Sequence, residues 1–148
     1  MLISYDGRYF TNLLHALNPL AFDCVWAYKL MPVLGVLFFI TSLYFLLSTI
    51  FVDEKKFYLI GYALFFTVVH FALAPSLPHD LYWMVSSFVY LWPWSFTFLW
   101  VAFYLRYINA VNNYSVFGWF VCCIISLVCC VGMNEMFLVT NALMLAFI

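Results

Sequence analysis

Charged residues are scarce in this 148-residue chain, where they make up 7% of the positions, with five Lys or Arg and six Asp or Glu. An average soluble domain carries about 25% charged and about 45–50% apolar residues, whereas 69% of this chain is hydrophobic. A water-soluble fold of this size could not cover so much apolar surface, and the same hydrophobicity excludes a disordered chain. Five basic residues form no basic patch, so we expect no binding of nucleic acid.

Glycine and short catalytic motifs are also scarce. The chain has five Gly and no Gly-x-x-x-Gly pattern, which is the usual device that lets transmembrane helices approach closely. It has neither the Cys-x-x-Cys pair of a thiol oxidoreductase nor the Gly-x-Ser-x-Gly turn of a serine hydrolase. Because an enzyme needs an acid, a base, a nucleophile or a metal in its site, we expect a non-catalytic protein.

Long uncharged runs are what the sequence has in place of charge. The run from Leu30 to Val52 contains no charged residue and exceeds the about 20 apolar residues that a spanning helix needs. Pro93 should kink a later run, so a neighbour must hydrogen-bond the carbonyl that this proline leaves free. The sequence predicts an all-α polytopic membrane protein, a single membrane domain with a bundle of four transmembrane helices at about 30–52, 57–76, 81–105 and 115–133.

Both ends of the chain are apolar without forming predicted spans. In residues 1–29, apolar side chains at helical spacing predict an amphipathic helix on the membrane surface, with His15 on its polar side; an ordered loop is the alternative. The apolar stripe consists of Phe10, Leu13, Leu14 and Leu17. Residues 136–148 are too short to cross a membrane. This apolar tail could lie at the interface, re-enter the membrane or pack against a partner.

His70 is an ionisable residue inside a predicted span, and such residues are functional candidates. The next span returns from the same side, so Ser86, Ser87 and Tyr90 should lie at the depth of His70. A hydrogen bond from His70 to one of them is the simpler interpretation. A cofactor site built from His70, Ser86 and Ser87 is the alternative, although a haem would need a second ligand or an open position. Ser86, His70 and Asp80 form a chance triple rather than a triad.

Four cysteines form two adjacent pairs in the fourth span. The pairs are seven residues apart and share a helix face; their members are Cys122, Cys123, Cys129 and Cys130. Thiolates could bind or pass on a soft metal ion such as Cu(I). Thiolates are costly in hydrocarbon and no His or carboxylate accompanies them, so the favoured interpretation is that these small side chains pack helices.

Aromatic residues make up 24% of the chain. Those near span ends fit the aromatic belt at the membrane interface, but Trp92, Trp94 and Trp100 fall within the third span. We expect these three residues to contact lipid or a partner subunit, because aromatic residues are enriched at protein interfaces. A groove for a lipid, a quinone or a pigment is the alternative.

These features predict a non-catalytic accessory or structural subunit of a larger membrane complex, such as a respiratory or other energy-transducing assembly. Its partners would be the lipid bilayer and other integral membrane subunits, and no cofactor is predicted. Two alternatives stay open: a small immunity- or exclusion-type protein that blocks another membrane protein, and a carrier of a small solute or soft metal that uses the cysteine pairs. The membrane would be a bacterial inner membrane or the mitochondrial inner membrane.

Overall fold

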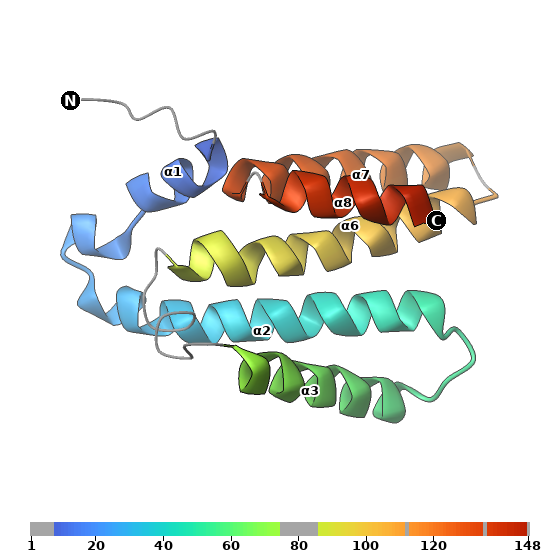
Figure 1. Ribbon diagram of the computed structural model, residues 1–148, viewed down its shortest axis with the longest axis horizontal. Helices are drawn as coiled ribbons and strands as arrows, with labels where there is room; N and C mark the ends of the chain where they lie inside the picture. Colours follow the sequence, from blue (N-terminus) through green and yellow to red (C-terminus); the bar gives the residue numbers. More distant parts are fainter. Residues whose placement is uncertain (1–7, 75–85, 112, 135, 148) are drawn as a thin grey trace.

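The structure is a computed structural model that describes residues 8–74, 86–111, 113–134 and 136–147. Every regular element in these ranges is helical (Figure 1). Four helices are long and apolar enough to cross a membrane, which confirms the predicted all-α membrane bundle. They are α2 (Val25–Ile50), α3 (Lys56–Leu73), the π-helical turn η2 (Ser87–Leu91) continued by α6 (Trp92–Ile108), and α7 (Asn113–Met133).

The helix ends differ from the predicted spans by a few residues. Helix α2 begins at Val25 rather than Leu30, so Lys29 belongs to the spanning helix and not to the surface segment. Its 26 residues rise about 39 Å at about 1.5 Å each, which exceeds the ~30 Å hydrocarbon core and leaves Lys29 among the head groups. Helix α3 ends at Leu73, and Ala74 is extended, as the steric influence of a proline favours for the residue before it. Residues 75–85, which include Asp80 and the predicted start of the third span, lie outside the described residues.

The spanning helices lie in a row, in the order α3, α2, α6 and α7 (Figure 1). Helix α6 is in the middle, and 44% of its spanning window is buried within the chain, against 17% for α3. The main core lies between α2, α3 and the start of α6, and is formed by Phe39, Leu43, Leu47, Leu59, Ala63 and Leu91. Helix α3 therefore lies at one end of the row and contacts the bundle mainly through α2.

The N-terminal segment folds as α1 (Tyr9–Ala16) and the 3-10 turn η1 (Pro19–Phe22). Helix α1 lies across the C-terminal end of α7 (Figure 1). The Thr11 hydroxyl donates to the carbonyl of Met133 at 2.9 Å, and the Tyr9 hydroxyl donates to that of Val128 at 2.8 Å. Because the last carbonyls of a helix have no partner within it, Thr11 supplies a donor where the end of α7 needs one. Tyr9 adds a second bond further inside the helix.

Helix α1 contacts the bundle through one residue of the predicted apolar stripe and one residue of its polar side. Phe10 contacts Phe96, with ring centroids 6.0 Å apart, and His15 contacts Phe88 at 5.6 Å. Leu13 and Leu17, which belong to the stripe, are 54% and 60% exposed. In a membrane, polar groups such as His15 gain more by contacting protein than apolar ones do. Partial burial lowers the pKa of His15 below its ordinary value of 6.5, which favours the neutral ring on Phe88.

The apolar tail forms α8 (Met136–Phe147), which turns back and runs antiparallel beside α7 (Figure 1). Its 12 residues rise about 18 Å, which is too short to cross the ~30 Å hydrocarbon core. The structure shows this tail folded back along α7, and we call α8 the re-entrant helix for this packing. Its depth in the membrane stays a prediction.

Gly132 allows the contact between α1 and α7, because a Cβ at this position would collide with the Tyr9 ring. We predict that Gly132→Ala displaces the Tyr9 side chain, breaks its hydrogen bond to Val128 and lowers the stability by about 1 kcal/mol, the usual net value of one hydrogen bond. Hydrogen exchange of the α1 amides and thermal unfolding in detergent measure this. The control is Gly118→Ala in the same helix, where a Cβ meets nothing within 4 Å; equal effects of the two changes would contradict the prediction.

Candidate functional site

The carbonyl that Pro93 leaves free in the third span is bonded by a side chain at the C-terminal end of α7. Pro93 has no N–H to donate to the carbonyl of Val89, the residue one helical turn before it. The Asn134 side-chain amide donates to this carbonyl oxygen instead, at 3.1 Å. The prediction that a neighbour must satisfy the freed carbonyl is thereby confirmed, and the neighbour is Asn134.

Asn134 also starts the re-entrant helix. Its Oδ1 atom accepts the backbone N–H of Met136 at 3.1 Å, and its backbone carbonyl accepts that of Phe137 at 3.0 Å. The residue is 5% exposed, so both ends of its amide are used away from solvent. One buried side chain therefore joins the turn that contains Val89 to the beginning of α8.

A second buried polar cluster lies between α6, α7 and α8, around the Cys130 thiol. The Asn141 amide donates to Cys130 Sγ at 3.2 Å, and Thr97 Oγ1 lies 3.2 Å from the same sulfur. The thiol also faces the carbonyl of Pro93 at 3.5 Å. The Asn141 Oδ1 atom is buried and accepts no hydrogen bond, so this cluster holds α8 in place at some energetic cost.

The remaining paired cysteines are half-buried and lie along α7. All five cysteines of the chain are free thiols, and the Ser126 hydroxyl between the pairs donates to the carbonyls of Cys122 and Cys123. Within the described residues, no three His, Cys, Asp or Glu side chains gather where a metal ion could bind. The Cys130 thiol forms a contact between helices.

His70 lies in an aromatic cluster. Its ring centroid is 4.8 Å from that of Phe39, 5.5 Å from Phe71 and 6.4 Å from Trp94. The hydrogen bond from His70 to Ser86, Ser87 or Tyr90 stays a prediction. Ser87 is buried and lies beside Gly35 of α2, and Tyr90 is 54% exposed. The lack of a side chain at Gly35 lets the π-helical turn approach α2, and Ser87 lies at this contact.

The three mid-span tryptophans pack within the chain. Trp100 is 2% exposed and stacks on Tyr104 with ring centroids 6.2 Å apart. The prediction that Trp100 contacts lipid or a partner is therefore wrong. Trp92 and Trp94 are half-buried. Trp92 lies between Phe38 and Phe88, at 5.3 and 5.1 Å, and the rings of Trp94 and Phe137 are 5.2 Å apart. With few small residues available, wide indole rings fill the space between these helices.

Arg106 directly follows the predicted third span, and in the structure it connects helices. It belongs to the last turn of α6, and its guanidinium group lies 4.1 Å from the centre of the Phe45 ring and 5.1 Å from that of Trp119. Its Nε–H donates to Thr49 Oγ1 at 3.1 Å. A cation between two aromatic faces is stabilised electrostatically, so Arg106 joins α2, α6 and α7 at this end of the bundle.

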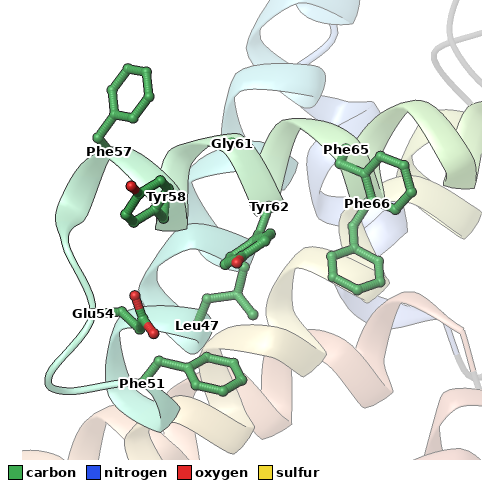
Figure 2. Close-up of a pocket in the computed structure, with 9 residues that line it drawn as sticks. All are labelled: Leu47, Phe51, Glu54, Phe57, Tyr58, Gly61, Tyr62, Phe65 and Phe66. Carbon is green, nitrogen blue, oxygen red and sulfur yellow. The ribbon is translucent and has the colours of Figure 1, made fainter.

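An open groove of about 750 Å³ lies between the end of α2 and the first half of α3 (Figure 2). Its residues are mostly aromatic, and the carboxylate of Glu54 at the turn between the two helices is its charged group. The groove is lined by Leu47, Phe51, Glu54, Phe57, Tyr58, Gly61, Tyr62, Phe65 and Phe66. The sequence contained no signal for it, because it depends on how far α3 diverges from its neighbours.

The coupling between Asn134 and Pro93 can be tested by a double-mutant cycle. We predict that Asn134→Ala destabilises the protein by about 1–3 kcal/mol, because the Val89 carbonyl is then buried without a donor. In the Pro93→Ala background the helix can supply that donor itself, so Asn134→Ala should cost clearly less. Chemical unfolding in detergent measures all four variants. Asn109, whose side chain donates to an exposed carbonyl at the end of α6, is the control position, and additive effects at positions 93 and 134 would refute the coupling.

Comparisons with known proteins give no information on what this geometry does. No family model, no curated protein and no solved structure matches the chain. The function is therefore inferred from three features: polar groups that connect helices inside the bundle, an outer helix held mainly on one side, and an open aromatic groove.

Proposed function

We propose that this protein is a non-catalytic integral membrane subunit that supports a larger membrane complex through its outer helix α3. The single observation that carries the proposal is the position of α3 at the edge of the row, where 17% of its spanning window is buried within the chain. A helix with this little internal contact leaves most of its surface for lipid or for another subunit.

The interior of the bundle supports a structural role. Asn134, Cys130 and Arg106 have polar or reactive side chains within the bundle, and each is engaged in a contact between helices. Residues that transport ions or protons usually face a polar cavity. Here the polar side chains hold α6, α7 and α8 together, which favours a scaffold over a transporter or an enzyme.

The outer face of α3 has the size and chemistry of a helix-packing surface. Its side chains recur at helical spacing and point away from the buried residues Leu59, Ala63 and Thr67. They are Phe57, Ile60, Leu64 and Val68, with exposures of 82%, 48%, 47% and 67%. Aromatic and branched side chains such as these pack well against a second transmembrane helix.

The two alternative functions receive different support. An exclusion-type protein that blocks another membrane protein would use an outer surface of the same kind, so α3 fits it as well. A soft-metal carrier would use the cysteine pairs, and the engagement of Cys130 by Asn141 and Thr97 disfavours it. The accessory subunit is preferred because the interior contacts make the bundle a stable support.

Site-specific photo-crosslinking tests the proposed contact of α3. With a photoreactive amino acid at Leu64, irradiation of native membranes should give one discrete protein adduct, whereas the same label at Ile125 should give lipid adducts. Ile125 is the control because it lies on α7 and is 57% exposed. Purification from the same membranes should yield the partner in a fixed ratio to the chain, as an accessory subunit requires. Migration of the chain alone, with equal labelling at both positions, would reject the proposal.

A further inference from the structure

We propose that the groove between α2 and α3 is a binding site for one phospholipid with a primary ammonium head group, that is, a phosphatidylethanolamine. The lipid's ammonium group would bind the Glu54 carboxylate, and one acyl chain would lie along the aromatic side chains of α3 (Figure 2). This inference does not depend on the proposed function, because it concerns the groove side of α3, which shares only Phe57 with the outer face, and a ligand that the isolated chain can bind.

The dimensions of the groove suit one acyl chain of one leaflet. Its volume of about 750 Å³ lies within the ~300–1,000 Å³ range of ligand pockets. From Phe57 to Phe66 the helix rises roughly 14 Å at about 1.5 Å per residue, close to half of the ~30 Å hydrocarbon thickness. The charged turn marks the head-group level, so a chain that starts there ends near the midplane, where Phe65 and Phe66 lie.

The charges at the mouth of the groove match a zwitterionic head group. The Glu54 side chain has no ion pair or hydrogen bond within the described part of the chain, which leaves a carboxylate to accept bonds from an ammonium group. Lys55 and Lys56 follow it directly and are exposed. Lys55 is the N-cap of α3 and Lys56 is its first residue, at a helix end where lysine side chains and free backbone N–H groups attract a phosphate. A carboxylate that lines the groove and two ammonium groups beside its mouth thus provide partners for both charges of the head group.

The polar groups within the groove favour a lipid over a second helix. Tyr58 and Tyr62 have no hydrogen-bond partner for their hydroxyls within the described residues, and both line the groove one turn apart. Such hydroxyls can donate to the phosphate or ester oxygens of a lipid. A second transmembrane helix offers fewer free acceptors, because most of its carbonyls are already bonded within that helix. A primary ammonium can donate to Glu54, whereas the quaternary ammonium of phosphatidylcholine cannot.

Gly61 provides a way to block the groove without disturbing the fold. It lines the groove, and a Cβ added to it meets nothing within 4 Å. Gly61→Leu therefore places a side chain in the space of the acyl chain, and it also replaces a poor helix former with a good one. Gly118→Leu is the matched control, because Gly118 lies within another spanning helix and has the same open surroundings.

The experiment measures lipid binding to the purified full-length chain by native mass spectrometry after delipidation. The probes are phosphatidylethanolamine, phosphatidylcholine and phosphatidylglycerol with identical acyl chains. We expect one phosphatidylethanolamine per chain, bound at least fivefold more tightly than either other lipid. Glu54→Gln should abolish the preference over phosphatidylglycerol while some binding remains, and Gly61→Leu should lose the bound lipid, with Gly118→Leu like the unchanged chain. Thermal unfolding checks that each variant is folded.

Other results would overturn the assignment. Equal binding of the three lipids by the unchanged chain would mean that the groove holds only the surrounding bilayer lipid. Retention of the preference in Glu54→Gln would remove the carboxylate from recognition. A protein adduct formed in native membranes by a photoreactive amino acid at Tyr62 would identify the occupant as a partner helix. Failure of the crosslink at Leu64 would affect the proposed function alone.

Discussion

The lack of water inside the bilayer is the constraint on which this structure depends. Each backbone group that the helices do not satisfy must find a partner in the protein, and the most demanding case is the carbonyl of Val89, which Pro93 leaves free. The amide of Asn134 satisfies it and also begins α8. The lack of water also explains why the Thr11 hydroxyl of α1 donates to the last carbonyl of α7. Hydroxyl groups need acceptors for the same reason, and many of them, such as those of Thr67 and Ser126, bond to carbonyls of their own helix.

The spacing of charges was sufficient to predict the four spans, because burying a charge in hydrocarbon is costly enough to override other preferences. Proline chemistry also predicted that a carbonyl near position 93 would need a donor. The identity of that donor was not predictable, because Asn134 is 45 positions away in sequence and reaches Val89 only through the packing of α7 on α6. The side of α1 that faces the bundle was not predictable for a related reason: apolar periodicity does not distinguish contact with protein from contact with lipid, and lipid accepts Leu13 and Leu17 at the surface.

The candidate sites show the same division. Residue chemistry drew attention to His70 and to the cysteine pairs. In the structure, aromatic rings surround His70, and an amide and a hydroxyl contact the Cys130 thiol. Arg106 and the groove near Glu54 became apparent only from the structure, because a cation–π contact and a cavity both depend on distances between helices. Aromatic side chains are common to all these places. In a chain with so few glycines, they set the spacing of the helices and leave an uneven outer surface.

The double use of Asn134 has a consequence for the order in which the chain folds during synthesis. A ribosome makes Val89 and Pro93 long before it makes Asn134, so the third span enters the bilayer with an unsatisfied carbonyl. Until α7 has crossed and returned the asparagine to the same side, this carbonyl must rely on water or on the insertion machinery. Maturation of the central helix is thus completed by the last part of the described chain, and the re-entrant helix begins to form at the same moment.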